Sequence, residues 1–300
     1  MITFLNLGKK GNLGNQLFQI ASTIGIADSN NQTYAFPNWK YVSFFKTELP
    51  LLQQAINFNT INEYCFEYTD YELKESNYNL NGWFQSEKYF CNSQIKAQFT
   101  FKENLLESLN EKYLTLINSK HILISVRRGD FVNNPFYFQL SYKYYFQAIT
   151  ECFPDWKSRN LLFTSDDISY CKSHFSFLKN AYFLEGMDAI EQLAFSSLCS
   201  DFIISNSTFS WWMAWLGERK NSKIIRPIKN FRGEFAEINN DKDFFPERWT
   251  SFQTSRKQLH FNYPTLVLKG EYFRIINYLN YESSRLLKVL KKNIKKVINQ

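Results

Sequence analysis

Apolar and polar residues follow one another along this chain in blocks of two kinds. Short apolar runs of strand length occur at 2–7, 121–126, 161–163, 181–184, 202–205 and 223–226. Stretches with an apolar residue at every third or fourth position, the period of a helix, occur at 17–24, 189–198 and 209–216. Because strands that alternate with helices build parallel sheets, the pattern predicts an α/β protein with a mostly parallel, doubly wound sheet.

This alternation weakens between residues 30 and 120, where Asn, Tyr and Phe are frequent. We therefore predict a domain boundary near residue 120. The expected units are an N-terminal α/β domain at 1–119, a Rossmann-like domain at 120–252 and C-terminal helices at 253–300.

The composition is that of a folded chain, since 44% of the 300 residues are apolar and 21% are charged. No apolar run approaches the roughly 18 residues of a membrane-spanning helix. The first residues lack the basic and apolar segments of a signal peptide. The five cysteines form no CxxC pair and the three histidines are scattered, which argues against a disulfide scaffold and a zinc finger. We expect a cytoplasmic protein.

The positive charge is concentrated at the C-terminus. The net charge is +7, and residues 281–300, the basic tail, carry six basic residues and one acidic residue, or +5. The tail is amphipathic, with Leu286, Leu290 and Ile294 on its apolar side. It is either a helix that lies on an anionic membrane surface or binds RNA, or a terminal helix packed on the body with its lysines in solvent.

Three polar segments follow predicted strands, where ligands bind in open parallel sheets. The first is Arg127, Arg128, Gly129 and Asp130, directly after the run at 121–126. Two arginines at the end of a buried strand are costly unless an anion meets them, and the guanidinium fork matches phosphate oxygens. Asp130 is placed to orient an arginine. The alternative is a purely structural network of Arg and Asp side chains.

The second segment is the loop at 8–16, which contains Gly8, Gly11 and Gly14 and ends in Asn15 and Gln16. Glycines between a strand and a helix suit backbone amides that approach an anion at the helix N-terminus. The spacing matches neither a Walker loop nor GxGxxG, and a plain tight turn is the alternative.

The third segment is Asn206, Ser207, Thr208 and Phe209, followed by a tryptophan-rich helix. Hydroxyl and amide groups at a helix N-terminus can cradle a phosphate. Ordinary capping of a helix whose tryptophans belong to the core is the alternative.

Together these segments resemble, in the same order, the motifs of the α-1,2-fucosyltransferase family. The matching stretches are 11–19, 126–131 and 205–212, with weaker matches at 165–167 and 245–249. The resemblance runs from about residue 3 to residue 249.

The resemblance implies a GT-B-like fold of two Rossmann-type halves with the active site in the cleft between them. It implies transfer of L-fucose from GDP-fucose to the 2-hydroxyl of a galactose residue in a glycan, with inversion and without an essential metal or other cofactor. The N-terminal domain would be the acceptor side and the domain at 120–252 would bind the nucleotide sugar. O-antigen or capsule biosynthesis is the expected setting.

The resemblance also implies roles for individual residues. Arg127 and Arg128 would face the pyrophosphate, with Asp130 as the third catalytic residue. The expected donor-binding residues are Gly14, Asn15, Gln16, Asp166, Glu191, Asn206, Ser207, Thr208 and Phe209. Glu191 stands where related enzymes carry an Asp that contacts the nucleoside.

This chain departs from the family pattern at two positions. Ser125 replaces the usual His and cannot act as a base near neutral pH. Phe131 replaces the usual Tyr, so that hydroxyl is missing. Pairing with an arginine makes Asp130 a weak base, so we expect it mainly to orient the arginines.

Two other functions compete with this interpretation. Asp241, Lys242 and Asp243 form a DxD sequence that would hold a metal in a different nucleotide-sugar transferase. The basic tail and the many aromatic residues would suit an RNA-binding protein, although the body is nearly neutral and we expect no nucleic-acid partner. Aromatic residues of the N-terminal domain either stack on a sugar or pack in the core; they include Trp39, Tyr41, Trp83 and Phe84.

Overall fold

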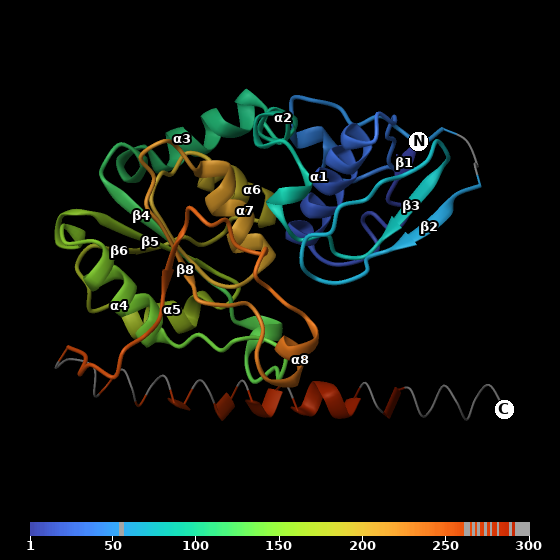
Figure 1. Ribbon diagram of the computed structural model, residues 1–300. Coiled ribbons are helices and arrows are strands. Elements are labelled where there is room, and N and C mark those ends of the chain that lie inside the picture. Colours follow the sequence, from blue (N-terminus) through green and yellow to red (C-terminus); the bar gives the residue numbers. More distant parts are fainter. Residues whose placement is uncertain are drawn as a thin grey trace.

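Two parallel sheets dominate the fold (Figure 1), where the sequence pattern alone predicts one parallel sheet and the family resemblance implies two halves. The computed structural model describes residues 1–53 and 57–260, and beyond them positions 265, 268, 271–272, 275–276, 278–280, 282–287 and 290–291. The first sheet has three strands in the order β1-β3-β2, and the second has six in the order β6-β5-β4-β7-β8-β9. The α/β prediction is confirmed.

The small sheet consists of very short strands. They are β1 (Ile2–Thr3), β2 (Asn59–Asn62) and β3 (Tyr78–Asn81). The apolar run at 2–7 is a strand for only two residues, because the chain turns where the Leu7 N–H donates to the Phe4 carbonyl. The strands β2 and β3 are rich in Asn and lack an apolar run, which is why sequence patterning did not predict them. Two helices accompany this sheet, α1 (Leu13–Ser29) and α2 (Asn92–Gln98).

The six-stranded sheet is built on a fully buried central strand. Its strands are β4 (His121–Val126), β5 (Asn160–Ser165), β6 (Ala181–Phe183), β7 (Phe202–Ile204), β8 (Ile224–Pro227) and β9 (Thr250–Phe252). Alternate residues of β4 enter opposite cores, since Leu123 belongs to one apolar cluster and Ile122 and Ile124 to the other. A sheet buried on both faces explains the unbroken apolar run at 121–126.

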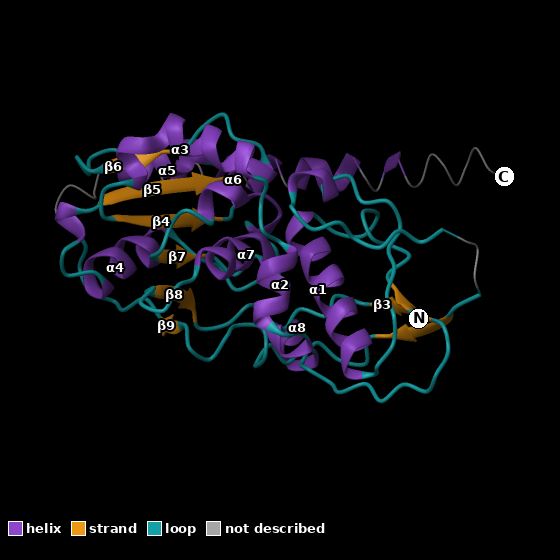
Figure 2. Cartoon of the chain, turned by 90° about the horizontal axis from the view of Figure 1, so that it is seen from above, coloured by secondary structure: helices purple, strands orange, loops and turns teal. Residues whose placement is uncertain are grey.

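Helices cover both faces of this larger sheet (Figures 1 and 2). Those against one face are α4 (Tyr142–Cys152) and α5 (Ile168–Phe175). Those against the other are α3 (Glu103–Ile117), α6 (Ala189–Ser196) and α7 (Thr208–Gly217). The short helix α8 (Gly233–Ile238) follows β8. Tyr113 of α3 packs edge-on against Phe195 of α6, so α3 belongs by its packing to the larger sheet.

The two halves share one apolar core through α1 and α7. The Phe18 ring lies 4.6 Å from the Trp211 ring and 5.0 Å from the Trp212 ring, centroid to centroid. Both tryptophans and Trp215 are fully buried. The tryptophans of α7 are therefore core residues that join the halves, and the polar residues before them are left to face the space between the sheets.

The segment around Arg248 returns to the small half and fastens it to the large one. Arg248 pairs with Glu87 at 2.5 Å and with Glu218, at the end of α7, at 2.6 Å. Asp243 pairs with Lys88 at 2.6 Å. The family-like stretch at 245–249 therefore contributes ion pairs between the halves.

No helix within the described residues is long and apolar enough to cross a membrane. Of the basic tail, positions 281, 288–289 and 292–300 lie outside the described residues. Leu286, Leu287 and Leu290 lie inside them, and each is more than half exposed.

Candidate active site

The carboxyl ends of both sheets open onto one cavity of about 640 Å³. Loops that follow β1 and β3 line it from the small sheet, and loops that follow β4, β5, β7 and β8 line it from the large sheet. In each parallel sheet this is the edge where side chains converge on a ligand. The three polar segments singled out in the sequence all reach this cavity.

The glycine loop is braced from behind by two glutamines. Gln16 Nε2 donates to the Gly11 carbonyl at 2.9 Å, and its Oε1 accepts from Trp39 Nε1 at 2.8 Å. Gln19 Nε2 donates to the Lys10 carbonyl at 3.0 Å. Gln16 lines the cavity, but its amide is engaged on both sides, so it holds the loop in shape.

Gly14 allows the first turn of α1 to touch the start of α7. A Cβ at this position would lie 2.5 Å from the Phe209 backbone nitrogen and 2.6 Å from the Thr208 carbonyl carbon. Real Cβ atoms do not approach backbone so closely, so only glycine fits without a shift of one helix. Gly14 of the loop therefore allows the two halves of the molecule to pack closely against each other.

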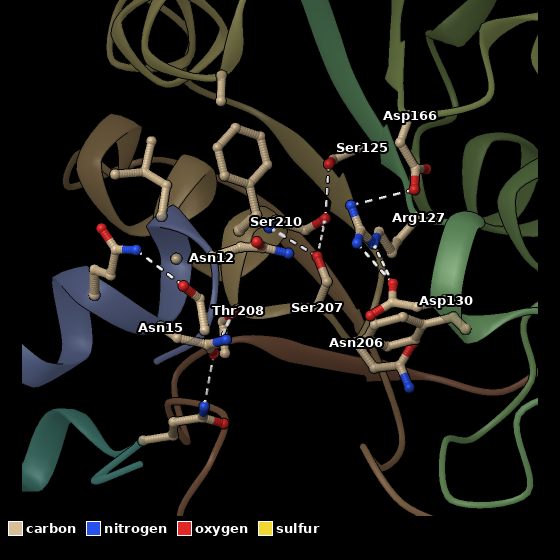
Figure 3. A pocket seen from close by; sticks show the side chains of 18 of the residues that line it. Asn12, Asn15, Ser125, Arg127, Asp130, Asp166, Asn206, Ser207, Thr208 and Ser210 are labelled. Carbon is tan, nitrogen blue, oxygen red and sulfur yellow. Dashed lines mark hydrogen bonds and ion pairs between the residues drawn. The ribbon is translucent and has the colours of Figure 1, made fainter. Parts of the chain in front are cut away.

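Asn15 connects the two halves across the cavity floor (Figure 3). Its Oδ1 accepts from Thr208 Oγ1 at 3.0 Å and from Gln85 Nε2 at 2.9 Å. Two residues predicted to bind the donor are therefore hydrogen-bonded to each other. Gln85 completes the group and was not singled out in the sequence, because it follows the polar strand β3.

Arg127 lies at the end of β4 between two carboxylates (Figure 3). Its Nη2 and Nε donate to Asp130 Oδ1 at 2.6 and 3.2 Å, and its Nη1 lies 3.1 Å from Asp166 Oδ2. Its side chain remains 26% exposed and lines the cavity. A guanidinium has five N–H groups, so two remain to meet an anion after these three contacts.

Asp166 fixes the backbone beside Arg127 as well as its side chain. Its Oδ1 accepts the Arg128 backbone N–H at 2.8 Å. A Cβ on Gly129 would lie 2.5 Å from Asp166 Oδ2, so the glycine leaves room for this carboxylate. Burial raises the pKa of Asp166, and the Arg127 charge and the Arg128 N–H oppose that shift.

Arg128 points away from the cavity, unlike Arg127. It is 8% exposed, its guanidinium carbon lies 3.9 Å from the Tyr170 ring centroid, and its Nε is 3.9 Å from Asp167 Oδ2. It does not line the cavity of about 640 Å³. The sequence motif places two arginines side by side, but successive residues at the end of a strand point in opposite directions, and the structure brings only Arg127 to the site.

The serine hydroxyl groups at the start of α7 are hydrogen-bonded to one another. Ser207 caps α7, with its Oγ accepting the Ser210 N–H at 3.1 Å. Ser125 Oγ lies 2.7 Å from Ser210 Oγ (Figure 3). Ser210 Oγ in turn lies 2.8 Å from Ser205 Oγ. Ser125, at the position of the family's His, is thus buried in a hydroxyl network.

Asn206 and Phe209 line the same wall of the cavity. Asn206 Nδ2 donates to the Phe138 and Asn230 carbonyls at 3.1 and 2.8 Å, so its amino group holds neighbouring loops. Phe131, which replaces the family's Tyr, stacks on Tyr137 with centroids 4.0 Å apart, and both rings line the cavity.

Glu191 does not line the cavity. Its carboxylate accepts the Asp188 N–H at 2.9 Å and completes a capping box at the start of α6. The next residue, Gln192, does line the cavity and accepts from Thr164 Oγ1 at 2.5 Å. The sequence could have pointed to Gln192, because it lies in the first turn of a helix that follows a predicted strand.

The DxD sequence is engaged in structural contacts. Asp241 accepts the backbone N–H groups of Asn230 and Phe231 at 2.5 and 3.1 Å, and Asp243 accepts the Tyr68 N–H in addition to pairing with Lys88. Neither aspartate lines the cavity. Within the described part of the chain, no group of three or more His, Cys, Asp or Glu side chains is arranged to hold a metal ion.

Two parallel sheets that open onto one polar cavity are the arrangement of the GT-B fold. The solved structure of POFUT1 in complex with GDP has the same fold, with a TM-score of 0.52 at 13% identity over 74% of this chain and 97% of that one. The predicted GT-B-like fold is therefore confirmed. The chain belongs to glycosyl transferase family 11, whose model matches residues 3–253, and this confirms the family inferred from the three motifs.

Curated relatives carry related names. The chain is 29% identical over 164 residues to the O-antigen biosynthesis glycosyltransferase WbnK and 30% identical over 183 residues to an alpha-1,2-colitosyltransferase, both of Escherichia coli. These matches cover 48% and 57% of this chain. They cover 52% and 61% of those two proteins, so the chain spans less than two thirds of either one. A galactoside 2-alpha-L-fucosyltransferase of Caenorhabditis elegans is 26% identical over 293 residues, covering 85% of this chain and 80% of that protein.

Proposed function

We propose that this protein transfers L-fucose from GDP-fucose to the 2-hydroxyl of a galactose residue in a glycan, with inversion at the fucose anomeric carbon. Family membership supports glycosyl transfer, and the name of the Caenorhabditis elegans relative supports the donor sugar and the acceptor. The observation that carries the proposal is Arg127, which is fixed by two carboxylates at the cavity and retains N–H groups for a diphosphate.

In this reaction the galactose 2-hydroxyl oxygen attacks the anomeric carbon while the bond from that carbon to the β-phosphate oxygen breaks. GDP leaves with the bonding electron pair, and Arg127 stabilises the negative charge that develops on it. The N-terminus of α7, whose first residue Thr208 lines the cavity, adds a partial positive charge.

Asp130 orients Arg127, because its Oδ1 accepts from two nitrogens of that guanidinium. In an inverting displacement the acceptor hydroxyl approaches on the face of the fucose opposite the diphosphate, whereas Asp130 lies beside the arginine that meets the diphosphate. The bond to the leaving group is largely broken when the hydroxyl attacks, so little base strength is needed and the hydroxyl proton passes to water.

The donor is held by residues of both halves that line the cavity. On the small half these are Gly14 and Asn15, with Gln16 shaping the loop. On the large half they are Asp166, Asn206, Ser207, Thr208 and Phe209, with Gln192 in place of Glu191.

The direct test is incubation with GDP-fucose and a panel of β-galactosides. We expect release of GDP, an α-1,2 linkage in the product by NMR, and the same rate with EDTA. A product with another linkage, or no transfer to any galactoside, would contradict the proposal.

A second donor sugar is supported by one relative. The alpha-1,2-colitosyltransferase is 30% identical to this chain over its match, so colitose is an alternative sugar at the same site. The same panel with GDP-colitose decides between them, since the preferred donor has the higher kcat/KM.

On acidification, the rate of transfer should begin to fall at a higher pH than the titration of an ordinary aspartate would give. Burial raises the pKa of Asp166, which faces Arg127 and Asp130. As the pH falls through that raised pKa, the carboxyl becomes neutral and releases Arg127, so the rate falls. The measurement is kcat/KM between about pH 4 and pH 8, and Asp166→Asn should remove this acid limb. An unchanged limb in the variant would assign it to another group.

The basic tail makes a peripheral contact with an anionic membrane. The exposed Leu286, Leu287 and Leu290 support this, because they are not covered by the described part of the body. Deletion of 281–300 should leave kcat on a water-soluble galactoside within about twofold and abolish co-sedimentation with vesicles rich in phosphatidylglycerol. Loss of activity in the deletion variant would contradict this contact. Failure of the full chain to co-sediment with such vesicles would contradict it as well.

A further inference from the structure

We propose that Trp83 is the stacking platform for the acceptor, and that the pyranose ring of the galactoside lies on its indole face. This inference rests on the proposed function and names where the acceptor binds. It concerns the wall of the cavity opposite Arg127, which is formed by the small half.

The carboxyl ends of β1 and β3 lead into this wall, and β2 runs parallel beside β3. The glycine loop follows β1, Glu63 follows β2, and Gly82 and Trp83 follow β3. The cavity is lined on this side by Lys40, Tyr41, Trp83 and Gln85 together with the glycine loop, and no carboxylate among the described residues lines it there. Aromatic rings with a few polar groups are the usual lining of a sugar or small-molecule site.

The position of Trp83 is fixed by its backbone. Glu63 Oε2 accepts the Trp83 N–H at 2.6 Å, and Glu63 Oε1 accepts the Phe84 N–H at 2.7 Å. A Cβ on Gly82 would lie 2.3 Å from the Glu63 Cβ, so the turn closes tightly on this side chain. Phe84 is fully buried with a φ of 50°, a left-handed conformation that the packing around it must enforce.

The indole ring stays accessible although its neighbours are buried. Trp83 is 36% exposed, while Trp39 and Phe84 are in the core. The core interpretation of the N-terminal aromatics therefore holds for Trp39 and Phe84, and Trp83 and Tyr41 are left facing the cavity. A large aromatic ring on a fixed backbone has only two side-chain torsions to order, so it binds with little loss of side-chain entropy.

The electrostatics of this wall suit a sugar ring. Lys10 Nζ lies 4.7 Å from the Trp83 ring centroid, and Lys40 Nζ lies 4.6 Å from the Tyr41 ring centroid. Both rings thus already attract positive charge to their faces. The C–H bonds on one face of galactose are weakly positive and would meet the ring in the same way, while its hydroxyls reach the polar side chains around it.

The test compares, in Trp83→Ala, the change in KM for the galactoside with the change in Kd for GDP. We expect KM for the galactoside to rise about tenfold or more, with the Kd for GDP changed less than about twofold. Trp83→Phe keeps a stacking face and should recover most of the affinity. Trp156→Ala is the matched control, since Trp156 is a partly exposed tryptophan with Lys157 over its ring and does not line the cavity.

The outcomes separate this inference from the proposed function. Normal transfer with an unchanged galactoside KM in Trp83→Ala would overturn the stacking role and leave the function standing. If the wild type transfers no fucose, the proposed function fails. Binding of a galactoside, measured without transfer, still tests the stacking role of Trp83. Saturation-transfer NMR with lactose and the GDP-loaded protein should then give a signal for the wild type and not for Trp83→Ala. Equal signals, or none for the wild type, would overturn the inference.

Discussion

Replacing Arg127 by alanine should lower kcat for sugar transfer by about 10²-fold or more, with little change in the free energy of unfolding. The guanidinium is part of the cavity surface, and Asp130 and Asp166 hold it in place. Its charge matters most when the diphosphate leaves, so the loss should fall on kcat. The measurement is steady-state kinetics together with thermal unfolding.

Arg127→Lys and Arg128→Ala provide the comparison. The lysine keeps the charge but loses the forked geometry, so it should recover only part of the rate. Arg128 is buried against Tyr170, so its removal should lower the free energy of unfolding by about 2 kcal/mol. A kcat within threefold of the wild type in Arg127→Ala would contradict the assignment of this residue.

Gly14→Ala should reduce both stability and transfer strongly. The new Cβ would lie 2.5 Å from the Phe209 backbone nitrogen, and neither α1 nor α7 can give way without moving a half of the molecule. Overpacking of this kind costs about 1–3 kcal/mol. The shift would also break the Asn15 to Thr208 hydrogen bond and displace the start of α7 from the site. Chemical unfolding and kcat/KM for the donor measure the two effects.

Gly8→Ala separates steric contact from backbone strain. Gly8 belongs to the same loop and has a φ of 79°, but no atom of its non-neighbouring residues in the described part of the chain lies within 4 Å of an added Cβ. This variant should cost only the strain of about 1 kcal/mol and keep its activity. If Gly14→Ala behaves like Gly8→Ala, the close packing of α1 on α7 is not what the loop provides.

The sequence predicts the large half of the molecule well and the small half poorly. β4 spans 121–126 as predicted, because a strand buried on both faces must be apolar throughout. The strands β2 and β3 are short and polar, so their hydrophobic pattern carries no signal. They matter for the site all the same, since Glu63 and Trp83 follow them.

Motifs in the sequence predict which segments line the cavity but not the direction of each side chain. Arg127 and Arg128 are equivalent in the sequence, and only the strand geometry sends one to the cavity and the other to Tyr170. Likewise Glu191 and Gln192 are neighbours, and the capping box of α6 occupies the first. Contacts between the halves, such as Asn15 with Thr208, join residues 193 positions apart and could not be read from either motif alone.

The measurement that tests the central claim most directly is a crystal structure with GDP bound. Diphosphate oxygens within hydrogen-bond distance of the free N–H groups of Arg127, with Arg128 still against Tyr170, would agree with this account. A diphosphate held elsewhere, with the Arg127 guanidinium turned away from it, would contradict the account.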